Sequence, residues 1–126
     1  MAVAPEAKQF ADYVVEFTQG LGPVTSKRMF GGFGLFLEEL MFGLIAGNTL
    51  YLKADDENRP DFVALGLLPF SYQKQGKEFS LSYYQAPEDA LEDMEEMTAW
   101  ATSAYGAALR AARGKARKKP RKSTQV

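Results

Sequence analysis

The sequence predicts an α+β fold in which an antiparallel sheet of five to six strands packs against an N-terminal helix, a short middle helix and a long C-terminal helix. Apolar residues recur at helical spacing near both ends of the chain, which is typical of amphipathic helices. Between them, short strand-like segments are joined by connections too short for the helical crossovers that a parallel sheet needs. The chain has 126 residues, a length that suits one domain.

The first predicted helix covers residues 7–19. Its apolar residues recur at positions i, i+4, i+7 and i+11, which places them on one side of a helix. They are Phe10, Val14, Phe17 and Leu21. Gly20, Gly22 and Pro23 follow, and we expect them to end the helix.

Strand-like sequence comes next, in residues 24–30, 35–37, 40–46 and 49–53. Gly47-Asn48 is a strong signal for a two-residue hairpin turn, and Glu38-Glu39 is expected to form another turn. We therefore expect three or four consecutive antiparallel strands in this part of the chain.

A short helix is predicted over residues 57–65. Asp55 or Asp56 can cap its start, and Gly66 would close its end. Phe62 and Leu65 would point at the sheet.

A second hairpin is predicted from residues 69–73 and 78–84, which flank Lys74-Gln75-Gly76-Lys77. In its later strand, Phe79, Leu81 and Tyr83 alternate with polar residues and Tyr84. This alternation predicts one buried face.

The last predicted helix runs from Asp93, a candidate cap, to about Arg113. Acidic residues crowd its start and basic residues its end, an order that suits the helix dipole. One stripe steps by three and four residues and consists of Met94, Met97, Ala101, Ala104 and Ala108. Its small residues permit close packing, for which we favour the core of the same chain over a homodimer contact.

The composition excludes several kinds of chemistry. There is no cysteine and no histidine, which excludes disulfides, thiol nucleophiles, Ser-His-Asp relays and the usual Cys/His metal sites. We expect no catalytic residues, no cofactor and no metal site, and therefore a protein that is not an enzyme. Apolar runs are too short to span a membrane, and no signal peptide is visible, so a cytoplasmic protein is expected.

Gly31-Gly32-Phe33-Gly34 is the most unusual local motif. Its spacing matches neither G-x-G-x-x-G nor the P-loop, and a strand rather than a helix follows it. It resembles RNA-binding loops and strands only weakly. We favour a bulge, a tight bend or close backbone packing over nucleotide or RNA recognition.

Four other clusters are notable, and three of them have two interpretations. Asp55-Asp56-Glu57 can hold a cation, but helix capping is the simpler account. Glu38-Glu39 is expected to be a solvated turn rather than a catalytic carboxylate pair, and Lys27-Arg28 to be a small basic patch at a strand end. An aromatic set can stack bases, but on alternating strands it is more often half core and half surface; it comprises Phe70, Tyr72, Phe79, Tyr83 and Tyr84.

Charge is divided unevenly along the chain. Residues 1–109 hold 7 basic and 16 acidic residues, a net charge of −9, whereas residues 110–126 hold 8 basic residues and no acidic ones. We expect a folded domain of residues 1–113 and a basic tail of residues 114–126 that is disordered beyond about residue 116. A solvated tail is the favoured interpretation, and nucleic-acid contact is the alternative. The candidate nucleic-acid-binding residues are Lys115, Arg117, Lys118, Lys119, Arg121 and Lys122.

Several segments, taken in order, resemble the N-terminal domain of the TfoX/Sxy family over about residues 10–113. They are residues 28–36 (RMFGGFGLF), 41–46 (MFGLIA), 50–55 (LYLKAD), 69–72 (PFSY), 82–87 (SYYQAP) and the helix around Trp100-Ala101. The resemblance implies an α+β domain with an antiparallel sheet packed by helices. Full-length family members are regulators of natural competence that act with the cAMP receptor protein at promoters and carry a second, C-terminal domain. We expect this chain to be a stand-alone N-terminal-type domain without the second one.

These observations predict a non-enzymatic regulatory or adaptor domain linked to transcription or competence. It would act through contacts with a protein partner, for which the transcription machinery is a candidate, with weak nucleic-acid binding by the tail. The alternative is a small-ligand-binding or enzymatic domain with a cleft near Gly31-Gly34.

Overall fold

The computed structural model describes the backbone of residues 5–29 and 31–123, and the side chains of these residues except 5–7, 72–74, 78–81 and 115–123. Within these residues, six strands form one antiparallel sheet. In chain order the elements are α1 (Pro5–Phe17), β1 (Thr25–Met29), β2 (Gly32–Leu37), β3 (Leu40–Ala46), β4 (Thr49–Lys53), α2 (Arg59–Ala64), β5 (Pro69–Lys74), β6 (Lys77–Gln85), the 3-10 helix η1 (Glu88–Leu91) and α3 (Met94–Ser123). The predicted α+β class is confirmed.

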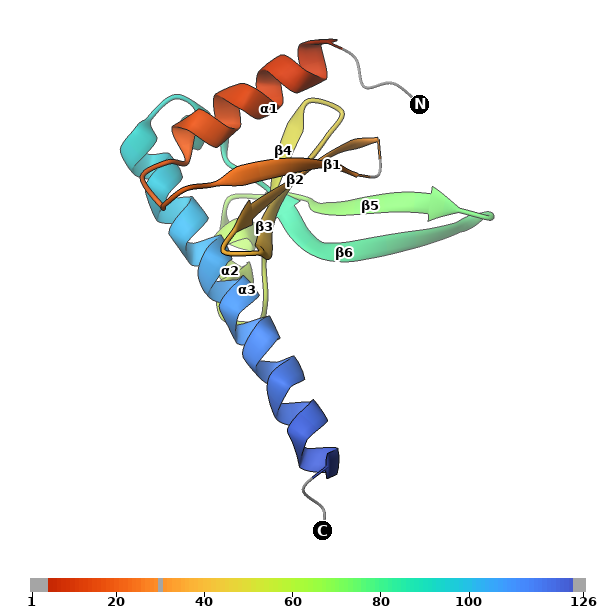
Figure 1. The fold of residues 1–126 in the computed structure, drawn as a ribbon. Helices are drawn as coiled ribbons and strands as arrows, with labels where there is room; N and C mark the ends of the chain where they lie inside the picture. Colours follow the sequence, from red (N-terminus) through yellow and green to blue (C-terminus); the bar gives the residue numbers. More distant parts are fainter. Residues whose placement is uncertain (1–4, 30, 124–126) are drawn as a thin grey trace.

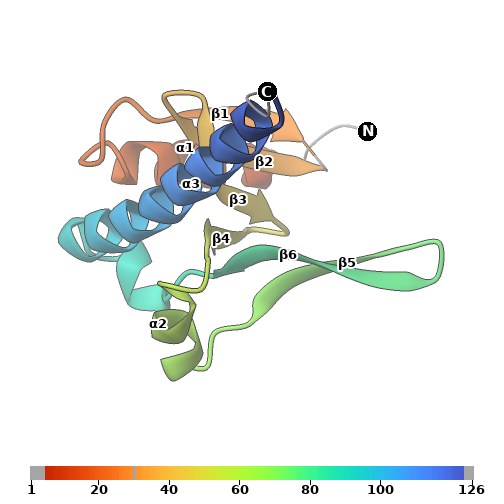
Figure 2. The ribbon, with the colours of Figure 1, turned by 90° about the horizontal axis from the view of Figure 1, so that it is seen from below.

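Helices α1 and α3 cover one face of the sheet (Figure 1). Helix α1 packs on β1 and β2, α3 packs on β3 and β4, and the two helices touch each other. Figure 2 shows α3 crossing the sheet while the β5–β6 hairpin extends away from both helices. The C-terminal part of α3 continues well past the sheet.

The strand order in the sheet is β1-β2-β3-β4-β6-β5. Strand β6, rather than β5, pairs with β4, so the second hairpin joins the sheet through its later strand. The predicted turns at Glu38-Glu39 and Gly47-Asn48 are confirmed. Both residues of each turn have positive φ, as hairpin turns that follow the twist of the sheet require.

Strand β3 is buried on both faces, and a bulge places Phe42 on the helix-covered face. Leu35 pairs with Gly43, whereas the next residue, Phe36, pairs with Met41, so Phe42 is an extra residue in the ladder. The bulge turns Phe42 to the helix-covered face, where Ile45 also lies in the main core. Leu44 alternates with Ile45 and is fully buried outside that cluster.

The main core lies between the sheet and the helices α1 and α3. Val14 of α1 and Ala101, Ala104 and Ala108 of α3 belong to it, so the alanine stripe is core, as favoured from the sequence. Met94 of the same predicted stripe is instead 49% exposed. Met94 is the first residue of α3 and lines a surface hollow with Gly20 and Thr98, outside the core.

Helix α2 buries Phe62 as predicted, but the prediction for Leu65 is wrong, because Leu65 is 57% exposed. The helix ends in a Schellman motif, in which the Gly66 amide donates to the Val63 carbonyl and the Leu67 amide to the Phe62 carbonyl. Gly66 has the positive φ that this motif requires. The motif directs Leu67 toward the core and leaves Leu65 at the surface.

Helix α3 continues to Ser123, past the predicted end near Arg113. Residues 114–123 therefore have helical backbone where the sequence predicted disorder from about residue 116. Alanine, lysine and arginine are strong helix formers, and the helical backbone continues past Pro120 to Ser123. The division of the chain into a domain and a separate basic tail stays a prediction.

Gly32 and Gly34 permit close packing of strands, as the favoured interpretation proposed, whereas a Cβ on Gly31 would meet nothing within 4 Å. A Cβ atom on Gly32 would lie 1.9 Å from the carbonyl oxygen of Ile45 in β3, and one on Gly34 would lie 2.6 Å from the sulfur of Met29. Backbone atoms of β3 therefore occupy the space that a side chain at residue 32 would need. Phe30 lies outside the described residues.

We predict that Gly32→Ala lowers the free energy of unfolding by about 2–4 kcal/mol, because β2 and β3 must separate to admit the methyl group. Gly114→Ala is the matched control, since a Cβ there meets nothing within 4 Å. It should raise the free energy of unfolding by about 0.5–1 kcal/mol, the usual helix preference for alanine. Urea unfolding measures both, and equal stability of the two variants would contradict the close-packing account.

Candidate functional site

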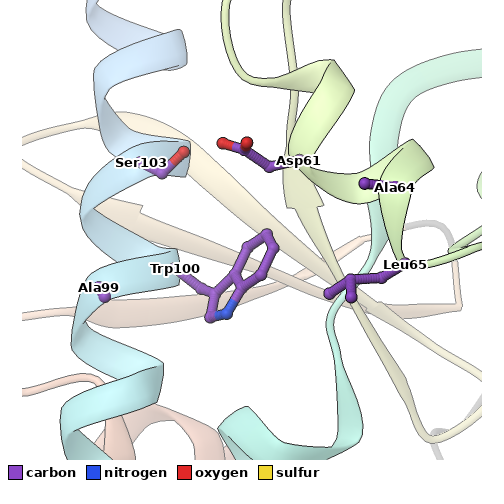
Figure 3. Close-up of a pocket in the computed structure, with 6 residues that line it drawn as sticks. All are labelled: Asp61, Ala64, Leu65, Ala99, Trp100 and Ser103. Atoms are coloured by element: carbon purple, nitrogen blue, oxygen red, sulfur yellow. The ribbon is translucent and has the colours of Figure 1, made fainter.

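A groove between α2 and α3 is the candidate functional site. Its volume is about 410 Å³, and it opens to the surface of the molecule. Figure 3 shows the indole of Trp100 extending from α3 toward α2, with Asp61 and Leu65 at opposite ends of the facing wall. We call it the α2–α3 groove; its lining residues are Asp61, Ala64, Leu65, Ala99, Trp100 and Ser103.

The floor of the groove is an aromatic stack that continues into the core. The ring of Trp100 lies 5.1 Å from that of Phe62, which in turn stacks on Tyr84 of β6 at 5.5 Å. Phe62 is fully buried, whereas Trp100 is only half-buried. One face of the indole is thus fixed by packing, and the rest of it is available to the groove.

Asn58, which is 5% exposed, joins the two walls of the groove. Its side-chain amide nitrogen donates to the Lys53 carbonyl at 3.1 Å and to the Ser103 hydroxyl and carbonyl oxygens at 3.1 and 3.3 Å. Its side-chain oxygen accepts from the Asp55 amide at 2.7 Å. A single buried side chain therefore connects β4, the start of α2 and the middle of α3.

Asp55 and Arg110 form a second link between the same elements. The guanidinium donates to both carboxylate oxygens, at 2.5 and 2.9 Å, and Arg110 also lies 3.3 Å from Glu57. The same carboxylate accepts from the amides of Glu57 and Asn58. The hydrogen bonds from Arg110 lower the pKa of Asp55 below its ordinary value of 3.8, against the opposing effect of burial. We call this set of contacts the Asp55–Arg110 link.

The chain segment that contains Leu65 exposes several large apolar side chains. Val63, Leu65 and Leu68 are 57%, 57% and 62% exposed, although they lie within six residues of one another in the chain. Leu65 also lines a second groove, of about 570 Å³, together with Leu67, Gln85, Pro87, Glu88 and Asp89 among others. Exposed large apolar side chains that border hollows are typical of binding surfaces.

The acidic residues near these grooves are mostly unpaired. In the described part of the chain, Asp61, Glu88 and Asp89 take part in no ion pair. The nearby cations already have partners, because Arg59 binds Asp56 at 2.6 Å and Arg110 binds Asp55. The local charge at the grooves is therefore negative.

Of the acidic residues singled out in the sequence, Asp55 caps the turn that leads into α2, because its carboxylate accepts from the amides of Glu57 and Asn58. Helix α2 itself begins later than predicted, at Arg59, and its cap residue Asn58 makes no side-chain cap hydrogen bond. Asp55 also pairs with Arg110. Glu38-Glu39 forms an exposed turn. Lys27 and Arg28 lie exposed on the edge strand β1, where Lys27 covers the ring of Phe36 at 5.1 Å.

The aromatic set does not form one surface. Tyr83 is buried, Tyr84 packs on Phe62, and Phe70 packs edge-on against Tyr51. The side chains of Tyr72 and Phe79 lie outside the described residues, as do those of the six candidate nucleic-acid-binding residues between Lys115 and Lys122. Those six residues have helical backbone in α3.

Sequence reasoning missed Asn58, Trp100 and Leu65 as site residues. The signals that were available are a lone tryptophan one position beside an alanine stripe and an asparagine directly before Arg59-Pro60. Neither indicates that α2 and α3 meet, because that contact depends on the tertiary packing of Phe62.

Two groups with shifted pKa values, Asp55 and Tyr83, have structural partners, and neither lines the groove. The buried Tyr83 hydroxyl donates to the Met41 carbonyl at 3.4 Å, and burial raises the pKa of Tyr83 to about 12. That phenol is therefore protonated at neutral pH. Asp55 is held ionised by Arg110, and Ser103 accepts from Asn58.

No helix in the described part of the chain is long and apolar enough to cross a membrane.

Comparisons with known proteins show which domain and which proteins the chain resembles. Residues 16–108 match the TfoX N-terminal domain, and this range includes every residue that lines the α2–α3 groove. The chain is 30% identical over 83 residues to DNA transformation protein TfoX1 of Aliivibrio fischeri, and 36% identical over 74 residues to DNA transformation protein TfoX of Haemophilus influenzae. It is 26% identical over 73 residues to protein Sxy of Escherichia coli.

The matches cover 66%, 58% and 58% of this chain, but 40%, 34% and 35% of those three relatives. The chain thus matches between a third and two fifths of the length of these relatives. Arg110 and the basic residues that follow it lie outside the matched range of the domain.

We predict that Asp55→Asn lowers the free energy of unfolding by about 1 kcal/mol at pH 7, because the amide cannot replace the charged link to Arg110. The folded-state pKa of Asp55 lies below 3.8, so its contribution is fully present above pH 3.8 and is lost as the pH falls through the folded-state value. The difference between wild type and variant should therefore shrink below pH 3.8 in unfolding measurements across pH.

Asp12→Asn is the control for this prediction. Asp12 pairs with Lys8 on the surface of α1, where both side chains are more than 60% exposed. We expect almost no change in stability for this variant. An equal loss of stability in the two variants would contradict a special role for the Asp55–Arg110 link.

Proposed function

Because this chain belongs to the TfoX N-terminal domain family, we propose that it is a regulatory domain in DNA transformation that acts by binding another macromolecule. The relatives named above are DNA transformation proteins, and we extend this link with competence to the present chain. A cytoplasmic location, expected from the sequence, is part of the proposal.

The observation that carries the proposal is the α2–α3 groove. Trp100 is held by Phe62 on one side and exposed on the other, and Asn58 and the Asp55–Arg110 link hold the walls together. A half-buried tryptophan in a rigid, apolar hollow is the kind of anchor that dominates protein–protein contacts. The contact surface is thus formed before a partner arrives.

We further propose that the domain is not an enzyme. The sequence has no histidine or cysteine, which are the commonest groups for proton transfer and nucleophilic attack near neutral pH. The two described groups with altered carboxyl or phenol pKa values, Asp55 and Tyr83, have structural partners that account for their positions. These observations favour binding over catalysis.

Nucleic-acid contact by the basic end of α3 is a second candidate function. The eight basic residues of residues 110–126 begin at Arg110, and α3 carries most of them past the sheet on one helix (Figure 1). These basic residues follow one another along a single helix, and such a concentration of positive charge favours contact with a phosphate backbone. The negative charge of the body disfavours such contact elsewhere.

We predict that this chain binds duplex DNA without sequence preference. If five or six cations meet phosphates, the logarithm of the association constant should fall by about 5 for each tenfold rise in salt. Replacing Lys118, Lys119 and Lys122 by Gln should reduce that slope by about 3. Fluorescence anisotropy with labelled DNA measures both values. Lys8→Gln on α1 serves as the control, and an unchanged slope in the triple variant would exclude the basic end of α3.

We also predict that Ala99→Gln reduces transformation in the organism that encodes the chain. Ala99 is exposed and lines the groove, so a longer neutral side chain should obstruct it without disturbing the core. A loss of about 1.4 kcal/mol in partner binding corresponds to a tenfold weaker contact, and transformation frequency should fall accordingly.

Thr102→Gln, three residues further along α3, is the matched control. Thr102 is also exposed but does not line the groove. Its transformation frequency should equal that of wild type, with equal protein levels in all strains. Normal transformation in the Ala99→Gln strain would contradict a role of the groove in transformation.

A further inference from the structure

We propose that the α2–α3 groove binds a basic amphipathic helix of a partner protein. In this proposal, apolar side chains of the partner enter the groove over Trp100, and lysine or arginine side chains meet the carboxylates around it. The inference rests on the proposed function, which states that the domain binds a macromolecule, and it adds the chemistry of the partner.

The apolar part of the groove matches one face of a helix. Trp100 forms the floor of the groove, and Ala64 and Ala99 contribute only small side chains to its walls. Leu65 is exposed at one end. The second groove shares Leu65, so the hollow surface continues past it toward Leu67 and Pro87. The α2–α3 groove is mainly apolar, whereas the second groove also has polar residues such as Gln85 in its lining. A hollow with an apolar floor and polar surroundings accepts apolar anchors spaced at i, i+3 or i+4, and i+7 on a helix.

The charges around the groove select a basic partner. Asp61 lies on the α2 wall, and Glu88 and Asp89 line the second groove. Glu96 lies one helical turn before Trp100 and therefore on the same side of α3. Within the described residues, none of these four carboxylates has an ion-pair partner, and Arg59 and Arg110 are already paired with other acids. An acidic partner would meet repulsion, and a basic one attraction.

The chain's own basic end does not fill the groove. Helix α3 is continuous from Met94 to Ser123, so the residues after Arg110 lead away from Ser103 along the helix axis. At 1.5 Å per residue, residue 117 lies roughly 21 Å past Ser103.

The basic end of a second copy is also a poor match, because its residues between Arg110 and Ser123 include no apolar side chain larger than alanine or proline. A small molecule would find only Asp61 and Ser103 as polar side chains in the groove, and Ser103 is engaged by Asn58. A separate partner with large apolar anchors is the occupant that both the apolar floor and the acidic surroundings fit.

Trp100 is the only tryptophan in the sequence, so its fluorescence reports directly on the groove. The test titrates the full chain with a synthetic helical peptide that has leucine at i, i+3 and i+7 and lysine or arginine on its other faces. We expect a saturable change in Trp100 emission. A peptide with glutamate in place of the basic residues, and another with alanine in place of leucine, should each bind at least about tenfold more weakly.

Variants of the chain locate the binding. Asp61→Asn and Leu65→Ala change exposed side chains of the groove and should each weaken binding of the basic peptide by about tenfold. Glu16→Gln on α1 and Met94→Ala at the start of α3 are the matched controls, since both residues are exposed outside the two grooves. Both controls should bind as wild type does.

Three results would overturn the proposal. The first is the absence of a saturable change in Trp100 emission when the basic peptide is added. The second is binding of the acidic peptide as tight as that of the basic one, or equal binding of the basic peptide by all four variants. The third is a change in emission with protein concentration alone, which would assign the groove to a second copy. Because the Ala99→Gln transformation assay does not depend on the peptide, a reduced transformation frequency beside a failed titration would overturn the partner's chemistry and leave the proposed function standing.

Discussion

Helix α3 approaches the sheet closely because its inward positions carry small side chains. Ala101, Ala104 and Ala108 are almost fully buried against the sheet, where larger residues would hold the helix further away. Asn58 and the Asp55–Arg110 link then fix the helix along its axis, since each binds a defined position of α3 to the segment between β4 and α2. The groove exists because these contacts place Trp100 against Phe62.

Most of the fold follows from local sequence. Period-two segments with Glu38-Glu39 and Gly47-Asn48 between them predict the hairpins, and the helical stripes predict α1 and the core face of α3. The pairing of β6 with β4 could not be predicted, because either strand of the second hairpin satisfies the same alternation. The exposure of Leu65 depends on the Schellman motif after Ala64, and the position of Phe42 on the helix-covered face depends on the bulge in β3.

The candidate site was not predictable, for a related reason. The sequence drew attention to glycine, acidic and basic clusters, and the structure gives the described members of the first two ordinary roles in packing, turns and capping. The groove residues are spread over two helices, and only long-range packing brings Asp61 and Trp100 to one hollow. The charge asymmetry of the chain fits this arrangement, since the acidic body carries the grooves and the basic end of α3 leads away from them.

The central claim is that the groove is formed in the free protein, with Trp100 fixed against Phe62. Nuclear Overhauser effects between the indole protons of Trp100 and the ring protons of Phe62, measured without any partner, test it most directly. The 5.1 Å separation of the two rings predicts strong effects and an indole resonance shifted by the neighbouring ring. Absent effects together with the chemical shift of a freely solvated indole would contradict the claim.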